Sequence, residues 1–141
     1  MAYRSQVGAG LLAAAAIVAW VGLIGVSAST SAQEMLASAG VYTAAQADRG
    51  MTLYDSTCAS CHELSRFKGK DFASAWSDKP LTDLHTAVRS MPMDNPGSLK
   101  PQEYADILAY FLSINGYPAG QKELEGTDAA IGAVKVDVKK P

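Results

Sequence analysis

Two cysteines and one histidine form the group of residues whose chemistry is easiest to interpret. Cys58, Cys61 and His62 make the pattern Cys-x-x-Cys-His, and the chain has no other cysteine. Two thiols at this spacing can form thioethers with the two vinyl groups of one haem, and the next histidine is placed to bind the iron as its proximal ligand. The pattern therefore predicts one covalently attached haem.

Two other uses of a Cys-x-x-Cys pair were weighed. A thioredoxin-like redox pair requires a strand followed by a helix within a sheet, and the surrounding sequence shows no such pattern. A structural zinc site requires further cysteine or histidine ligands, and His85 is the only other histidine. The haem interpretation accounts for both cysteines and the histidine together.

Three residues are candidates for the second axial ligand. Met91 and Met93 lie in a segment, residues 91–97, whose two prolines and one glycine exclude a helix. An isolated methionine usually fills a core, but this segment is polar and stiff, which favours a ligand. His85 lies on a predicted helix and is expected at the surface or in packing. A methionine ligand favours electron transfer, whereas an open position would let a gas or peroxide bind.

Two helices are predicted before the proline-rich segment. Thr43 and Gln46 have the spacing of a capping box, which predicts a helix that begins there and leads directly to Cys58. Pro80 begins a second helix that ends near Ser90.

A third helix has the clearest pattern in the chain. Pro101 stands at its first position, and Asn115 followed by glycine ends it. These helices predict an all-α fold of three to five helices packed around one covalently bound haem c. The apolar face of the third helix contains Tyr104, Ile107, Leu108, Phe111 and Leu112.

The N-terminal segment has the layout of an export signal. Residues 7–28 are apolar or small and follow a single basic residue, Arg4. Small-residue cleavage sites follow Ala28 and Ala32, but the apolar run is also long enough to span a bilayer. A core helix is the remaining alternative. We expect residues 1–32 to be a signal peptide or membrane anchor that places the rest of the chain in the periplasm, either soluble or tethered.

The remaining chain divides into three parts. Residues 33–43 are expected to be a linker, residues 44–120 a haem domain, and residues 121–141 an extended C-terminal arm. The arm is predicted because valines alternate with charged residues, although no partner strand is evident in the sequence. The alternating residues are Val134, Val136 and Val138.

The charge of the chain bears on its partners. The formal net charge is -2, which excludes a general affinity for nucleic acid. Between residues 66 and 100, however, basic residues outnumber acidic ones. They are either a solvated surface or a patch that steers an acidic partner. The basic residues are Arg66, Lys68, Lys70, Lys79, Arg89 and Lys100.

From Ala44 to Gly120 the sequence resembles the class I c-type cytochromes, in particular the single-haem bacterial periplasmic type. The resemblance rests on the Met-Pro-x-x-x-Pro-Gly segment at residues 91–97 and on Tyr-Ala-Asp-Ile-Leu-Ala-Tyr at residues 104–110. It implies the cytochrome c fold. It also implies that Met91, which precedes proline, is the sixth iron ligand in preference to Met93.

The resemblance assigns further roles. It implies that Trp76 lies against the haem, and that Gly50 and Tyr54 of the first helix cross the last helix at Ile107 and Tyr110. A serine or threonine usually caps the last helix in this family. Lys100 stands there instead.

The expected function is outer-sphere transfer of single electrons between redox proteins, with no catalytic residues. Donors would be a dehydrogenase or respiratory complex, and acceptors an oxidase or a photosynthetic reaction centre. The alternatives are a dedicated cytochrome subunit of a periplasmic dehydrogenase for alcohols or sulfite, and a gas or peroxide site with an open sixth position.

Overall fold

The structure, a computed structural model, describes residues 33–138. The expected leader or anchor, residues 1–32, and the last three residues lie outside the described residues. Within the described range, none of the helices combines the length and the apolar character needed to cross a bilayer.

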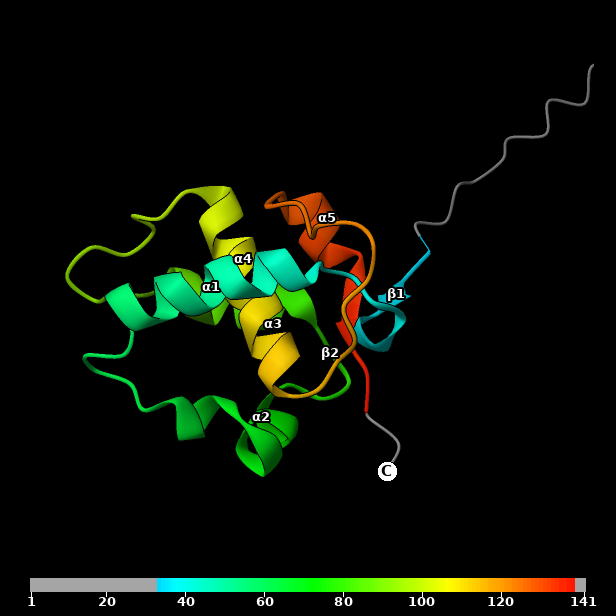
Figure 1. Cartoon of the computed structure of the whole chain (residues 1–141), viewed down its shortest axis with the longest axis horizontal. Coiled ribbons are helices and arrows are strands. Elements are labelled where there is room, and N and C mark those ends of the chain that lie inside the picture. Colours follow the sequence, from blue (N-terminus) through cyan, green and yellow to red (C-terminus); the bar gives the residue numbers. More distant parts are fainter. Residues whose placement is uncertain (1–32, 139–141) are drawn as a thin grey trace, which may run out of the picture.

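Five α-helices dominate the described residues, and three very short strands form a small sheet beside them (Figure 1). The helices make the fold predominantly α-helical. The elements in chain order are β1 (Met35–Leu36), η1 (Ala37–Ala39), α1 (Ala44–Thr57), η2 (Leu64–Phe67), α2 (Gly69–Trp76), β2 (Lys79–Pro80), α3 (Leu81–Arg89), α4 (Pro101–Ile114), α5 (Asp128–Gly132) and β3 (Val134–Val136).

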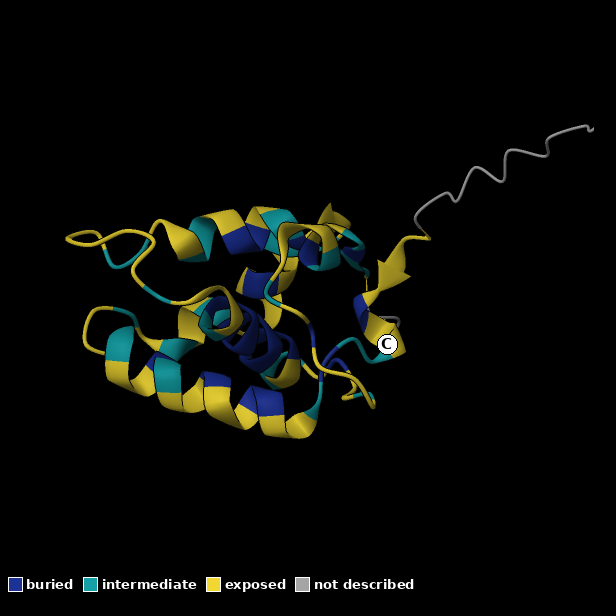
Figure 2. Ribbon diagram, turned by 90° about the horizontal axis from the view of Figure 1, so that it is seen from above, coloured by how far each residue is buried: buried dark blue, intermediate teal, exposed yellow. Residues whose placement is uncertain are grey.

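Helix α4 is the centre of the core. Every residue from Tyr104 to Leu112 is buried, and Figure 2 shows the contrast with α1, which is exposed on its outer face. The packing of α1 on α4 depends on a glycine. A Cβ atom at Gly50 would collide with the carbonyl group of Asp106 and would lie 2.9 Å from the Cβ of Tyr110. Only glycine lets the two backbones approach this closely.

Helices α1 and α4 begin where the sequence predicts, but one predicted capping side chain has a different partner. Thr43 caps α1 by accepting a hydrogen bond from the backbone N–H of Gln46 (3.2 Å), as predicted. The Gln46 side chain does not complete a capping box. It is fully buried and bonds instead to the backbone N–H and carbonyl of Leu124, both at 2.8 Å. At α4, the Glu103 carboxylate accepts from the backbone N–H of Lys100 (2.7 Å), so the start of the helix is capped without a serine or threonine.

The two ends of the described chain form more structure than a linker and an extended arm. Strand β3 lies between β1, which is parallel to it, and β2, which is antiparallel. These partner strands could not be recognised from the sequence because β1 and β2 contain only two residues each, too few to show alternation. Ahead of β3, Thr127 caps the five-residue helix α5 by accepting from the N–H of Ala130.

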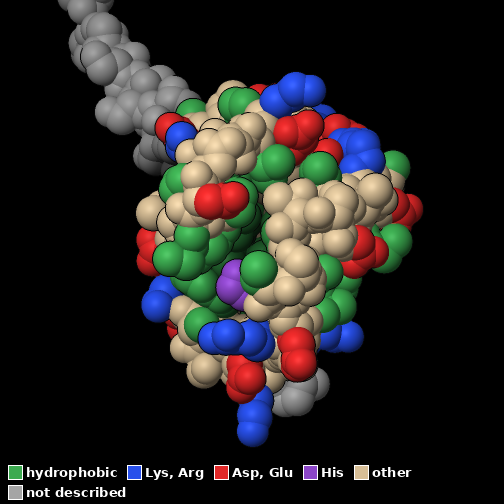
Figure 3. Space-filling model, turned by 90° about the vertical axis from the view of Figure 1, so that its left-hand side faces the viewer, with side chains coloured by type: hydrophobic (Ala, Val, Ile, Leu, Met, Phe, Trp, Pro, Cys, Tyr) green, Lys and Arg blue, Asp and Glu red, His purple; other side chains and the backbone are tan. Residues whose placement is uncertain are grey.

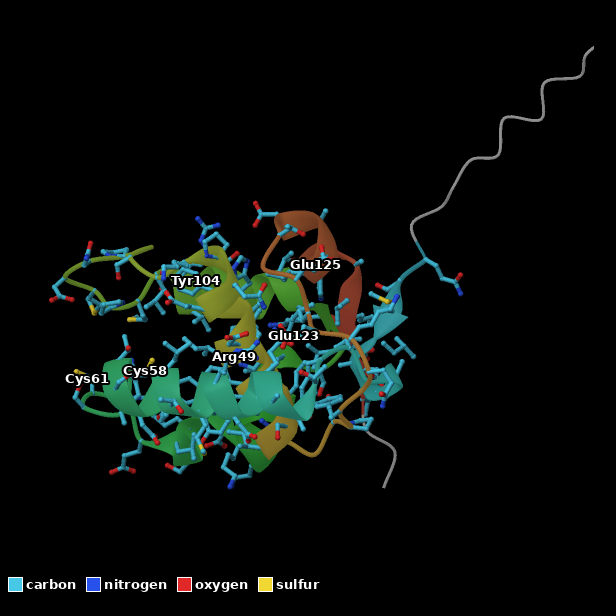
Figure 4. The ribbon with its side chains drawn as sticks, turned by 45° about the horizontal axis from the view of Figure 1, so that its top comes forward. Arg49, Cys58, Cys61, Tyr104, Glu123 and Glu125 are labelled. Atoms are coloured by element: carbon cyan, nitrogen blue, oxygen red, sulfur yellow. The ribbon has the colours of Figure 1, made fainter. Side chains whose placement is uncertain are left out.

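The C-terminal segment, residues 117–138, is held against the rest of the described chain by polar bonds, of which the side-chain bonds of Tyr42 and Gln46 are buried. The Tyr42 hydroxyl donates to the carbonyl of Tyr117, and the N–H of Gly120 donates to the carbonyl of Tyr42, both at 2.6 Å. Arg49 of α1 contacts Glu123 and the buried Asp106, both at 2.9 Å, and these two carboxylates raise the pKa of its guanidinium. The segment therefore covers the end of the core that lies away from Cys58 (Figure 4).

Replacement of Gly50 with alanine is predicted to destabilise the protein by about 2 kcal/mol or more, because the added methyl group must push α1 away from the backbone of α4. Gly132→Ala is the control, since its Cβ would meet only a Thr82 methyl group at an ordinary 3.6 Å. That variant should change the free energy of unfolding by less than about 0.5 kcal/mol. Denaturant unfolding of the three proteins gives both values, and equal stability of the two variants would contradict the assigned close contact.

Candidate functional site

The two cysteines and the histidine lie at the C-terminal end of α1. Cys58 follows the last residue of the helix, and Cys61 stands on the loop beyond it (Figure 4). The backbone N–H groups of Cys61 and His62 both donate to the carbonyl of Cys58, at 3.1 and 2.9 Å. The helix thus ends in a tight turn that keeps both thiols and the imidazole close to one point. Burial raises the pKa of the Cys58 thiol.

The backbone of His62 is held by the core of the molecule. The Tyr54 hydroxyl donates to the carbonyl of His62 at 2.6 Å. The His62 ring meets the edge of the Phe67 ring at a centroid distance of 5.8 Å, and Phe67 in turn stacks on Phe111 of α4 at 4.6 Å. Asn115, at the end of α4, donates from its amide to the carbonyl of Phe67 (2.7 Å). His62 is therefore positioned from α1 and from α4.

A cleft opens beside these residues. It consists of two adjoining cavities of about 400 and 180 Å³, which share five lining residues. Figure 3 shows the face on which hydrophobic side chains and a histidine surround a hollow. Among the lining residues, Asp94 alone carries a full charge. The residues common to both cavities are Cys58, His62, Val88, Met91 and Ile107.

The loop between α3 and α4 forms the opposite side of the cleft. Its base is closed by a hydrogen bond from the N–H of Gly97 to the carbonyl of Arg89 (3.0 Å). Met91 is half-buried and lines both cavities, whereas Met93 is 81% exposed and lines only the larger one. The structure thus brings both methionines to the cleft that contains His62, with Met91 the more enclosed.

Trp76 and His85 lie in different places. Trp76, at the end of α2, lines the smaller cavity together with His62 and Met91, and the Lys79 ammonium stands 5.6 Å from its ring centroid. His85 lines neither cavity of the cleft. It is buried on another face of α3, towards Tyr104.

The cleft suits a large apolar group held by sulfur and imidazole. Its lining is almost free of charge, and it includes two thiols, one imidazole and two thioethers, which are donors that bind haem. Within residues 33–138 there is no cluster of three or more histidine, cysteine, aspartate or glutamate side chains that could hold a bare metal ion. These donors therefore fit a haem better than a protein-only metal centre.

Comparison with known families agrees with this chemistry. Residues 45–111 match the family model described as cytochrome c oxidase, cbb3-type, subunit III, a match that spans slightly less than half of the chain. The match supports a c-type cytochrome domain. Such a domain implies covalently bound haem c and haem-based electron transfer. No curated protein and no solved structure gave a significant match.

Several residues that shape the site were missed at the level of sequence. Phe67 lies in a charged, glycine-containing loop without periodicity, and the pattern gave it no role. Asn115 was interpreted only as a helix stop, yet its side chain ties η2 and the start of α2 to α4 through Phe67 and the N–H of Gly69. Leu99, which lines the larger cavity, was likewise given no role in the site. No local signal distinguishes these roles.

Proposed function

We propose that this chain is a periplasmic monohaem c-type cytochrome that carries single electrons between redox proteins of a respiratory or photosynthetic chain. The observation that supports this most directly is the cleft, where Cys58, Cys61, His62 and Met91 lie around one largely apolar space. The periplasmic location rests on the export-type sequence of residues 7–28.

Each residue has a defined task in this proposal. Cys58 and Cys61 hold the haem through thioethers, His62 provides the proximal ligand, and Met91 provides the sixth. Trp76 packs against the haem from the side of α2. The bound haem supplies an iron that alternates between the ferric and ferrous states. A methionine in the sixth position leaves no place for a gas or peroxide, so Met91 favours transfer of electrons over chemistry on a small ligand.

The protein around the cleft would hold the proximal ligand in place. The hydrogen bond from Tyr54 and the stacked Phe67 and Phe111 fix the His62 segment, which would limit movement of this ligand when a bound haem gains or loses an electron. The mouth of the cleft remains at the surface (Figure 3), which gives a partner access to an edge of the haem.

The exposed charges suit a transient encounter. All six basic residues between positions 66 and 100 are exposed. Arg89 and Lys100 each lie within 4 Å of a carboxylate, Asp128 and Glu103 respectively. No ion pair is found for Arg66, Lys68 or Lys70 in the part of the chain that the structure describes. Basic groups of this kind attract an acidic partner surface, and the attraction weakens as salt is added.

Replacement of Met91 with alanine is predicted to abolish the weak far-red absorption band of the ferric protein, because that band requires a thioether sulfur on the iron. The ferrous form of the variant should then bind carbon monoxide, which the unmodified protein should not do readily. Met93→Ala is the matched control and should retain the band. If Met93→Ala loses the band while Met91→Ala keeps it, the ligand assignment is wrong.

A second candidate function is that of a dedicated cytochrome subunit within a larger oxidoreductase. It is favoured by the match of residues 45–111 to the family model of an oxidase subunit. A respiratory oxidase or a periplasmic dehydrogenase for alcohols or sulfite would then be the partner complex.

Capture of the native protein from solubilised membranes distinguishes the two functions. A carrier should be recovered without stoichiometric partners, and any bound protein should leave at raised ionic strength, because its contacts are transient and electrostatic. Retention of an oxidase or dehydrogenase in constant ratio through a salt wash would show a subunit and would contradict the carrier.

A further inference from the structure

We infer that His85 takes up a proton when the proposed haem site takes up an electron, so that the reduction potential of the protein depends on pH through this residue. The inference rests on the proposed function, because it requires a haem in the cleft. It concerns a residue that lines neither cavity of the cleft.

His85 lies in a second cavity of about 330 Å³ that is separate from the cleft. The C-terminal segment helps to form this cavity, since Gly126 and Asp128 line it opposite α3. The loop between α3 and α4 contributes Gly97 to the wall of this cavity, and the first turn of α4 contributes Pro101. The cavity gives the buried imidazole a route to solvent.

The buried imidazole of His85 lacks a full set of hydrogen-bond partners. Its side chain is 6% exposed, and its Nε2 has no hydrogen-bond partner. Its Nδ1 lies 4.0 Å from the carboxylate of Asp128, which also lies 3.8 Å from Arg89. Tyr104 contributes only the edge contact of its ring, and its hydroxyl accepts the N–H of Leu99 at 3.3 Å. The charged groups that face His85 are therefore Arg89 on α3 and Asp128 on α5.

These groups act on the imidazole in opposite directions. Burial lowers the pKa of His85 most strongly, Arg89 lowers it further, and Asp128 raises it. Because the neutral imidazole is favoured by burial and the charged one by Asp128, a modest change in the surrounding charge alters its protonation. A change of one charge in the neighbouring cleft would be such a change.

A thin layer of side chains separates His85 from the cleft. On α3, Leu84 and Val88 line the cleft, while their neighbours His85 and Arg89 line the second cavity. Leu99 lines both the second cavity and the larger cavity of the cleft. Charges act on each other more strongly across apolar side chains than across water. The two cavities are thus placed for electrostatic coupling.

With haem bound, one electron from a reduced partner protein would convert ferric iron to ferrous and so remove one positive charge from the cleft. One proton arrives from solvent through the second cavity and converts the neutral imidazole of His85 to imidazolium, with Nδ1–H facing Asp128. By thermodynamic linkage, reduction raises the pKa of His85, and protonation of His85 raises the reduction potential by the same free energy.

The test is a spectroelectrochemical titration of the haem-loaded protein from about pH 4 to about pH 8, a range that extends below the usual titration of histidine because burial lowers the pKa of His85. The potential of the wild type should fall as pH rises between the pKa of His85 in the ferric form and its higher value in the ferrous form. Above and below this window the potential should be flat. In His85→Gln this step should be lost, while any titration of the haem carboxylates remains in both proteins.

Two surface variants provide a sharper control, because a purely structural role of His85 would not predict their opposite effects. Asp128→Asn should move the step to lower pH, and Arg89→Gln should move it to higher pH. Both side chains are more than half exposed, so the variants should fold even if His85→Gln does not. NMR titration of the His85 imidazole in the two oxidation states should give the higher pKa in the ferrous form.

A potential that is measurable but lacks this step, or a step that persists in His85→Gln, would overturn the inference and leave the proposed function intact. Shifts of the step in the same direction in the two surface variants would also overturn it. A protein that carries no reducible haem would instead contradict the proposed function, and the absorption spectrum recorded before the titration separates that outcome.

Discussion

The contact between α1 and α4 at Gly50 is the constraint on which the rest of the structure depends. Because the glycine has no side chain, the backbone of α1 reaches the carbonyl of Asp106, and the next turn brings Tyr54 against Tyr110 and Phe111. This crossing fixes the direction in which α1 ends. The end of α1 carries Cys58, so the packing of two helices determines where the Cys-x-x-Cys-His sequence lies.

From this crossing, the remaining elements complete the cleft. Phe67 stacks on Phe111 of α4 and also contacts the His62 ring, so α4 helps to position this ring. The loop that begins at Met91 forms the opposite side of the cleft. The C-terminal segment covers the far end of the same helices and is held there by Gln46, Arg49 and Tyr42. That segment also forms one wall of the cavity around His85. Through Asp128 it places a carboxylate beside this imidazole, although the segment itself lies far from the two cysteines.

The sequence predicted those features that are encoded locally. The roles of Cys58, Cys61 and His62 follow from their spacing alone and stay predictions. The helices that begin after Thr43 and at Pro101 are confirmed, because their caps and apolar faces can be recognised without a structure. Features that depend on distant partners were not predicted. Gln46 has the spacing of a capping residue, but a buried peptide group 78 positions away is the partner that it satisfies. The short strands likewise exist because tertiary packing aligns them, and two residues carry no periodic signal.

The central claim is that one haem is joined covalently to Cys58 and Cys61. The most direct measurement is the intact mass of the purified polypeptide, produced in cells that can attach haem and recorded after denaturation and extraction with acidified organic solvent. The account predicts a coloured protein whose mass exceeds that of its amino acids by one haem. A colourless protein with only the mass of its amino acids would contradict it.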